Sequence, residues 1–415
     1  MAEELQAEDV LAAEELAALD AAGPVELLVG IPTLNHARSV VQVLEGVAKG
    51  LARHFPGRRT AVLAADAGSQ DGTLEAIRTW KASIPPEPMV LTVRLAGPLA
   101  RGRAILAILA AARRLEAQGC GLVDAGLTGL APEWVDRLLQ PALRREADYV
   151  SPAYTRTVAE GTLTTNLLAP MTRALYGIRL QQLMGGCAGM SAALVRRFLQ
   201  DDVWTSELAG YGIEVWLPTE ALGSGAKVAE VHLGRKQVGP GPAHTELATT
   251  LVRTVGPLFA LMERYRAIWQ EVRGSVPAPQ AGGPPDLLPP AGEIAVERMV
   301  RAFRLGLKDL LPIWEQIMPE ETLAQLYPLG LLAADEFRFS TPLWARVVSD
   351  FAVTYQERRL ARDHLLRALA PLYLGRVAAF LLEARVGPPG DLPVILDNIG
   401  RAFEAEKGNL TARWR

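Results

Sequence analysis

The stretch VELLVGIPTLN, Val25 to Asn35, is a continuous apolar run that breaks at Pro32. Strands inside a parallel sheet have this composition because helices cover both of their faces. The next segment, residues 37–55, has apolar residues at helical spacing. This stretch therefore predicts the first strand and the first helix of an α/β domain.

Three more strand and helix pairs follow along the chain. The predicted strands are RRTAVLAAD (58–66), MVLTVRL (89–95) and GCGLVDAG (119–126), and a helical pattern follows each of them. Four such alternations predict a doubly wound, mostly parallel sheet. Ligands of such sheets bind outside the carboxyl ends of the strands, which here carry residues 32–35, 66–71 and 124–126.

The predicted organisation has four parts. Residues 1–24 read as an N-terminal helix that ends at Gly23 and Pro24, and residues 25–273 as the α/β domain. Residues 274–292 are rich in Pro and Gly, which is typical of a linker or an extended wrap. Residues 293–415 have helical patterns throughout and predict an all-α C-terminal domain.

Composition excludes several classes of protein. The 415 residues carry a formal net charge of -3, and no basic stripe indicates nucleic-acid binding. The apolar run at 104–112 is too short to span a membrane, and the acidic N-terminus does not resemble a secretory signal. Two cysteines, Cys120 and Cys187, are too few for a disulfide framework or a cysteine metal site. We expect a cytoplasmic protein.

Two loops at the predicted ligand edge attract attention. In DAGSQDGT (66–73), Asp66 stands at a strand tip where it can accept a hydrogen bond from the NH edge of a base, and Asp71 and Thr73 suit helix capping. In GIPTLN (30–35), Pro32 and Asn35 shape a turn under which a base and ribose can lie. Both loops are equally typical of plain turns between a strand and a helix.

Charged residues give further candidates, each with a structural alternative. Arg101 and Arg103 lead into a helix whose start suits a diphosphate, or they form a solvated basic loop. Glu214 stands in an apolar strip and needs a substrate or an ion-pair partner. Asp124 ends a strand as a metal ligand or as a turn residue. His232 reads as a structural histidine or a ligand, and His244 lies in a loop.

Together, IPTLN, DAGSQDGT, the Asp-centred strand end, the GG pair before a helix and YGIE resemble, in this order, GT-A-type nucleotide-sugar glycosyltransferases. Within them, residues 25–237 are most similar to the retaining glucosyl-3-phosphoglycerate and mannosylglycerate synthases. Residues 337–355 and 372–383 resemble the C-terminal domain of mannosylglycerate synthase. The resemblance implies transfer of a hexose from a nucleoside diphosphate sugar to a small hydroxylated, glycerate-like acceptor, with retained anomeric configuration.

The resemblance also implies roles for individual residues. Catalytic roles fall to Asp124, as the first acid of an Asp-x-Asp pair, and to Glu214. The residues implied for the nucleotide are Pro32, Leu34, Asn35, Asp66, Gly102 and Arg103. Those implied for the donor sugar and the acceptor are Gly185, Gly186, Tyr211 and Gly212.

The departures from that pattern concern the metal ion. The second acid is replaced by Gly126, the expected histidine by Val238, and the acid after the paired glycines by Cys187. Mg²⁺ or Mn²⁺ is therefore expected only if other residues, such as His232 or His244, rebuild the site. Without the ion another positive group must offset the diphosphate. Arg235 and Lys236 follow the last predicted strand and are expected to offset the charge of the diphosphate. Arg101 and Arg103 are further candidates for this role.

Three functions remain open on the sequence. The first is a glycosyltransferase that needs no metal ion. The second is a non-catalytic nucleotide-sugar-binding protein that has lost the metal site. The third is a scaffold whose helical part mediates assembly. The nucleotide (uracil or guanine), the sugar, the acceptor and the oligomeric state, a homodimer included, are not determined by the sequence.

Overall fold

The computed structural model describes residues 7–82, 88–95, 101–205, 210, 212–237, 246–283, 287–288, 295–386 and 391–414. Tyr211, Val238 and His244, three of the positions discussed above, lie outside these residues.

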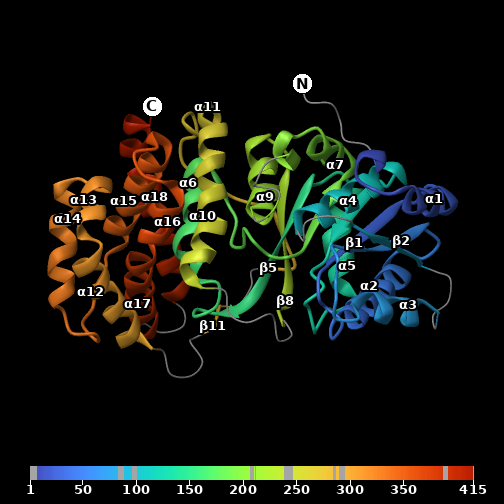
Figure 1. Ribbon diagram of the computed structural model, residues 1–415, viewed down its shortest axis with the longest axis horizontal. Helices are drawn as coiled ribbons and strands as arrows, with labels where there is room; N and C mark the ends of the chain where they lie inside the picture. The colour runs from blue at the N-terminus through green and yellow to red at the C-terminus, as the bar shows by residue number, and fades with distance from the viewer. Residues whose placement is uncertain are drawn as a thin grey trace. The chain divides into compact units, whose positions relative to one another are not determined.

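A nine-stranded, mostly parallel sheet organises the N-terminal part of the chain (Figure 1). Its strands are β1 (Leu27–Thr33), β2 (Thr60–Asp66), β3 (Met89–Arg94), β4 (Gly119–Leu122), β5 (Tyr149–Thr157), β7 (Ala188–Ser191), β8 (Val228–Arg235), β10 (Gln280–Ala281) and β11 (Leu287–Leu288). The order is β10-β8-β5-β7-β4-β1-β2-β3, with β11 paired to β5. Strand β7 runs antiparallel to β4 and β5.

Strand β1 lies inside the sheet, as its composition predicts. All seven of its residues are buried, and it pairs in parallel with β2 and β4. Helices α2 (Val40–His54), α3 (Thr73–Ala82) and α5 (Glu133–Leu143) pack together on one face, and α4 (Arg101–Arg114) and α7 (Ala192–Leu199) on the other (Figure 1). The predicted fold class, an α/β domain with a mostly parallel sheet followed by a helical region, is confirmed.

The remaining elements are mainly helical. They are η1 (Ala7–Asp9), α1 (Ala13–Ala22), the π-helical turn η2 (Thr164–Leu168), α6 (Ala169–Tyr176), η3 (Asp202–Thr205), α9 (Ile213–Gly223), α10 (Leu247–Arg264), α11 (Arg266–Trp269), α12 (Val296–Asp309), α13 (Leu311–Ile317), α14 (Glu320–Leu326), η4 (Tyr327–Leu331), α15 (Thr341–Glu357), α16 (Arg362–Ala368), α17 (Ala370–Val386) and α18 (Leu392–Arg413). A separate pair of short strands, β6 (Ile178–Arg179) and β9 (Val276–Pro277), completes the set.

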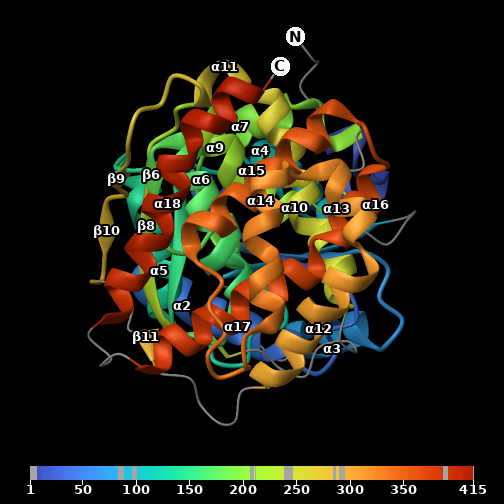
Figure 2. The ribbon, with the colours of Figure 1, turned by 90° about the vertical axis from the view of Figure 1, so that its left-hand side faces the viewer.

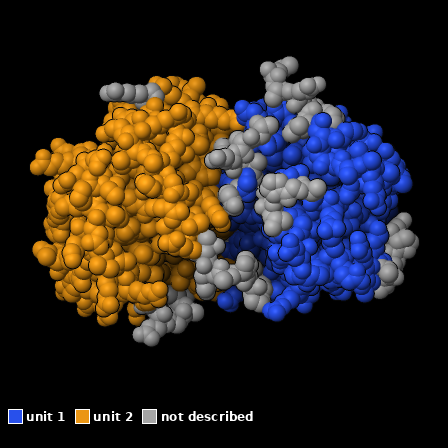
Figure 3. Space-filling view, in the orientation of Figure 1, with its two compact units in different colours: residues 1–154, 184–243, 278–285 blue, residues 155–183, 244–277, 286–415 orange. Residues whose placement is uncertain are grey.

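The chain divides into two compact units (Figure 3). Unit 1 contains residues 1–154, 184–243 and 278–285, and unit 2 contains residues 155–183, 244–277 and 286–415. Residues 155–183 and 244–273, expected in the α/β domain, group with the C-terminal helices, and so do residues 274–277 of the expected linker. Their helices explain this grouping, because α6 packs against α18 (Figure 2) and α10 packs against α16.

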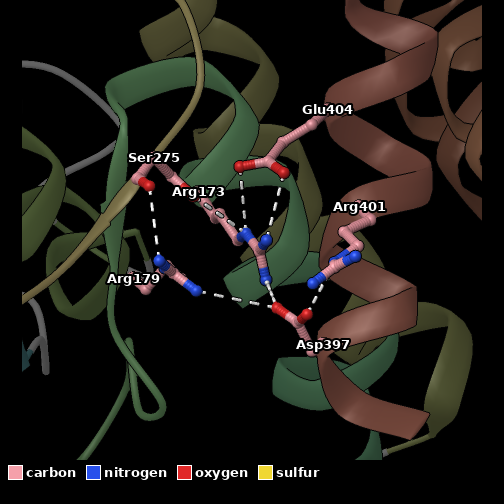
Figure 4. Close-up of polar contacts among 6 residues, drawn as sticks. All are labelled: Arg173, Arg179, Ser275, Asp397, Arg401 and Glu404. Atoms are coloured by element: carbon pink, nitrogen blue, oxygen red, sulfur yellow. Dashed lines mark hydrogen bonds and ion pairs between the residues drawn. The ribbon is translucent and has the colours of Figure 1, made fainter. Parts of the chain in front are cut away.

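Within unit 2, a group of charged residues joins α6 to α18 (Figure 4). We call Arg173, Arg179, Asp397, Arg401 and Glu404 the charge cluster. Arg173 Nη1 donates to Asp397 at 2.8 Å, and its Nη2 and Nε donate to Glu404 at 3.0 and 3.1 Å. The nearby Gly400 has no side chain, and a Cβ there would lie 2.3 Å from Arg173 Nη1. The glycine is therefore required by the close passage of the guanidinium.

One helical stretch of unit 2 is unusually apolar. Among the described residues, Arg362–Arg385 is long and apolar enough to cross a membrane, and 72% of its most apolar window is buried inside the protein. This stretch is longer than the apolar run at 104–112 and was not predicted from the sequence. Burial of this extent is typical of a core helix, which is apolar on all sides.

Candidate active site

The loops that follow β1 and β2 are joined by hydrogen bonds in unit 1. Parallel pairing sets Thr33 opposite Asp66 at the ends of the two strands. Beyond them, the Asn35 N–H donates to Ser69 Oγ at 2.8 Å, and Asn35 Oδ1 accepts from the Gln70 N–H at 2.9 Å. Asn35 has a φ of 57°, in the left-handed region that Asn tolerates better than most residues. The two loops named in the sequence analysis therefore form one structure.

Asp71 and Thr73 complete this junction. Asp71 Oδ1 accepts from the Thr73 N–H at 3.1 Å at the start of α3, and Asp71 Oδ2 accepts from the Ala37 N–H at 3.0 Å. These bonds lower the pKa of Asp71 against the opposing effect of burial. The capping role expected for Asp71 is confirmed, whereas the Thr73 hydroxyl oxygen accepts from the His36 N–H of the neighbouring loop instead.

Asp66 is fully buried under the same turn. Its Oδ1 accepts from the N–H groups of Gly68 and Ser69, both at 2.9 Å, and its Oδ2 accepts from the Thr33 hydroxyl at 3.2 Å. The carboxylate thus holds the loop in shape. Contact of Asp66 with a base stays a prediction.

Asp124 follows β4 at the same edge of the sheet. Its side chain is 20% exposed, and its Oδ1 accepts from the Gly126 N–H at 2.9 Å. Gly126 therefore supplies a backbone donor at the position where the resembled enzymes have a second acid. Burial opposes ionisation of Asp124, but Arg101 and Lys236 outweigh it and lower the pKa of this carboxyl.

Arg101 lies between two carboxylates. It is the first residue of α4, and its Nε lies 2.7 Å from Glu214 Oε1 in the first turn of α9. Its Nη2 lies 3.7 Å from Asp124 Oδ2, beyond hydrogen-bond distance. Burial opposes the charge of the guanidinium, and Glu214 and Asp124 raise its pKa overall. Arg101 therefore stays charged, and one end of it is left free of short contacts to these acids.

Lys236 adds a second positive charge. Its ammonium group donates to Gly185 O at 2.9 Å, and the Tyr154 hydroxyl donates to the same oxygen at 3.0 Å. Gly186 has a φ of 76°, and a Cβ there would lie 2.8 Å from Asp124 Oδ2 and 3.2 Å from Lys236 Nζ. Gly186 thus lets the backbone pass close to both the carboxylate and the ammonium group.

The other predicted site residues occupy varied positions. Pro32 and Gly102 are buried, Leu34 and Arg103 are half-buried, and Gly212 precedes the first turn of α9. Arg235 ends β8 and is exposed. The structure therefore places Lys236, but not Arg235, beside Asp124, and any contact of Arg235 with a diphosphate stays a prediction.

These residues do not fit a divalent cation. In the described part of the chain, no three His, Cys, Asp or Glu side chains are grouped so that they can hold a metal ion. Asp124 is flanked instead by Arg101 and Lys236, whose charges repel a cation. Cys187 is buried beside Lys236, and burial raises the pKa of its thiol, which disfavours the thiolate that a metal ion needs. The backbone oxygen of His232, which was named above as a possible metal ligand, accepts a hydrogen bond from Arg137.

One residue of this edge, His36, was not predicted from the sequence. It directly follows Asn35, and its N–H donates to Thr73 Oγ1 at 2.9 Å. The charges of Asp124 and Arg101 both act on its imidazole. A histidine directly behind a loop already assigned to the ligand edge was the signal that could have identified it.

No protein-family model matches the chain, and no curated protein matches it significantly. Several solved structures are similar to it. They include glucosyl-3-phosphoglycerate synthase from Mycobacterium tuberculosis in complex with Mn²⁺, UDP and phosphoglyceric acid, which is 21% identical over 61% of this chain and 83% of that chain, with a TM-score of 0.45. The same enzyme with Mg²⁺ and UDP is 21% identical over 60% of this chain and 83% of that chain, with a TM-score of 0.44.

A further structure, described only as a mycobacterial protein, is 23% identical over 60% of this chain and 78% of that chain, with a TM-score of 0.44. Glucosyl-3-phosphoglycerate synthase is one of the enzymes that the motifs of this sequence resemble. Likeness at this level carries no argument about chemistry, and the proposals below depend on the residues of the site.

Proposed function

We propose that this protein is a cytoplasmic glycosyltransferase that moves a hexose from a nucleoside diphosphate sugar to a small hydroxylated acceptor without a divalent cation. One observation carries the proposal: the Arg101 guanidinium lies between Asp124 and Glu214, and Lys236 is also close to Asp124. The glycerate-like acceptor and the retained anomeric configuration are proposed from the sequence resemblance alone.

The position of the site supports this proposal. The loops after β1 and β2, and Asp124 after β4, lie at the carboxyl ends of neighbouring parallel strands. Ligands of open α/β sheets bind outside these ends, because the loops there leave a crevice. A nucleotide bound at this edge would lie against the joined loops.

The charges support a diphosphate leaving group. Cleavage of the bond between sugar and diphosphate leaves negative charge on the diphosphate, and fixed positive groups stabilise that charge in the transition state. Arg101 can donate two N–H groups to phosphate oxygens in one plane, whereas Lys236 acts as a point charge. These two residues would together do what a divalent cation does in a metal-dependent transferase.

Glu214 would change partners during the reaction. Before the donor binds, its Oε1 is paired with Arg101 at 2.7 Å. A diphosphate competes for the guanidinium, because it brings more negative charge than one carboxylate. Glu214 is then released and can accept hydrogen bonds from hydroxyl groups of the donor sugar or the acceptor. Positioning and electrostatics, without a protein nucleophile, would carry the reaction.

Calorimetric titration tests the proposal. The purified protein is titrated with UDP, GDP and their glucose and mannose derivatives, first with Mn²⁺ and then with EDTA. We expect one nucleotide to bind with micromolar affinity, about -8 kcal/mol, equally well in both conditions. Release of the nucleoside diphosphate in the presence of glycerate or phosphoglycerate then tests turnover. Binding that requires Mn²⁺ would contradict the role of Arg101.

A non-catalytic nucleotide-sugar-binding or scaffold protein is the second candidate. Gly126 and Cys187 favour it, because they stand where the resembled enzymes have acids. Nucleotide binding without turnover of any acceptor supports a binding protein. Absence of nucleotide binding in both conditions supports a scaffold.

A further inference from the structure

The ammonium group of Lys236 is held by two neighbouring groups. It donates to Gly185 O at 2.9 Å, and it lies over the Tyr154 ring, 5.4 Å from the ring centroid. The face of an aromatic ring carries partial negative charge and attracts a cation at this distance. In the described part of the chain the ammonium group forms no other hydrogen bond, so two of its three N–H groups remain for a ligand.

Tyr154 is itself fixed by its surroundings. It lies in β5, its residue is 3% exposed, and its ring packs against Trp134 with 5.5 Å between the ring centroids. The hydroxyl donates to Gly185 O at 3.0 Å, so that the tyrosine and the lysine share one acceptor. Burial raises the pKa of the Tyr154 hydroxyl well above its ordinary value, and the side chain is neutral. The ring face, and not a phenolate, therefore attracts the ammonium group.

Lys236 lies close to Asp124 without pairing with it. A Cβ on Gly186 would lie 2.8 Å from Asp124 Oδ2 and 3.2 Å from Lys236 Nζ. Among the ion pairs of the described residues, however, Asp124 is joined to Arg101 and not to Lys236. The ammonium group of a lysine stands on a flexible four-carbon stem, so without other support it would turn towards a carboxylate so close by. The Tyr154 ring thus keeps the charge of Lys236 available for a ligand.

We propose that Tyr154 is a positioning residue, whose ring face holds the Lys236 ammonium group in place for the diphosphate of the nucleoside diphosphate sugar. Tyr154 acts through Lys236 and does not itself contact the donor. Because the charge is fixed before the leaving group forms, nothing has to be ordered during the reaction. This assignment rests on the proposed function, in which Lys236 stabilises the diphosphate.

A double-mutant cycle separates positioning from stability. The wild type, Tyr154→Leu, Lys236→Met and the double variant are titrated with UDP in EDTA by calorimetry, or with GDP if the wild type prefers guanine. We expect Tyr154→Leu to weaken binding about 5- to 10-fold and Lys236→Met about 10- to 30-fold. In the Lys236→Met background, Tyr154→Leu should change the affinity by less than about 2-fold, because the ammonium group on which it acts is gone.

Three further variants support the cycle. Tyr154→Phe keeps the ring face and should bind UDP within about 2-fold of the wild type. Phe55→Leu shortens another buried aromatic side chain of unit 1, and it should lower the unfolding temperature without changing the affinity for UDP. If Tyr154→Leu does not fold, Tyr154→Met takes its place in the cycle, because methionine fills the space with a flexible side chain that has no ring.

The outcomes distinguish this proposal from the proposed function. If Tyr154→Leu weakens UDP binding by the same factor with and without Lys236, Tyr154 is merely structural and only the proposal for Tyr154 is overturned. It is also overturned if Tyr154→Phe binds as weakly as Tyr154→Leu, since the hydroxyl and not the ring is then needed. If the wild type binds neither UDP nor GDP, the proposed function fails and the assignment of Tyr154 fails with it.

Discussion

Arg101 in unit 1 and Arg173 in unit 2 both lie between two carboxylates, but their surroundings differ. All three guanidinium nitrogens of Arg173 donate at 2.8 to 3.1 Å, to Asp397, Glu404 and Ser275, and its side chain is 11% exposed (Figure 4). Arg101 has one short contact at 2.7 Å and one long one at 3.7 Å, and its side chain is 30% exposed. A guanidinium whose donors are all used stabilises a fold, whereas one with donors to spare can bind a ligand.

The largest expected effect is on stability in unit 2. Arg173→Ala leaves Asp397 and Glu404 without their shared partner, and removing one member of a mostly buried ion pair should cost about 3 kcal/mol of the free energy of unfolding. Urea unfolding measures this loss. Arg401→Ala is the matched control, because Arg401 also pairs with Asp397 but is 71% exposed, and it should cost less than about 0.5 kcal/mol. Equal losses for the two variants would contradict the comparison.

Arg101→Ala should instead weaken nucleotide binding and leave the stability of the protein almost unchanged. We expect UDP to bind about 100-fold more weakly, a loss of about 2.7 kcal/mol, because the main diphosphate donor is gone. The free energy of unfolding should change by less than about 1 kcal/mol, since a partly exposed pair contributes little. Arg113→Ala, at the other end of α4, serves as the control. A stable variant with unchanged UDP affinity would show that Arg101 is structural.

Gly400 tests how closely Arg173 is packed. Gly400→Ala should destabilise the wild type by about 1 to 2 kcal/mol, because the new Cβ would lie 2.3 Å from Arg173 Nη1. In the Arg173→Ala background the same change should stabilise by about 1 kcal/mol, since Ala favours a helix over Gly. Urea unfolding of the wild type, the two single variants and the double variant measures the effect of Gly400→Ala on the free energy of unfolding in both backgrounds. If the new Cβ clashed with a group other than Arg173, Gly400→Ala would destabilise the protein in both backgrounds.

Glu214→Gln tests the exchange of partners at Arg101. Removing the competing carboxylate should strengthen UDP binding about 5-fold, or about 1 kcal/mol, while sugar transfer falls. A Glu214 that contacts the nucleotide directly would instead make this variant bind UDP more weakly, and calorimetry separates the two results. Glu133→Gln, in the first turn of α5, is the control.

The smallest expected effect is a pH dependence of stability. Arg173 lowers the pKa of Asp397, and it lowers the pKa of Glu404 against the opposing effect of burial. A carboxyl whose pKa is lower in the folded state stabilises fully above its unfolded pKa of about 4, and this contribution is lost as the pH falls through the folded value. Between pH 5 and pH 3, Arg173→Ala should therefore lose less stability than the wild type. The free energy of unfolding of both proteins is measured between pH 5 and pH 3. An equal fall in the two proteins would contradict this linkage.

Local patterns predicted the elements well. The burial of β1 follows from its apolar composition, and the cap that Asp71 provides follows from ordinary turn chemistry. The domain boundaries were harder to predict from the sequence, because residues 155–183 and 244–277 have no local signal that they group with the C-terminal helices. His36 was missed because its contact with Thr73 depends on how the two loops pack, and a sequence does not show that.

The sequence by itself determined the alternating strands and helices, the edge of the sheet that carries the candidate site, and the absence of a second acid at Gly126. These features depend on hydrophobic periodicity and on residue identity within short segments. Only the tertiary structure decided that Arg101 pairs with Glu214 rather than lying in solvent, and that Lys236 rather than Arg235 lies beside Asp124. An ion pair between segments far apart in the chain depends on how the elements that carry them pack, and no local pattern encodes that geometry.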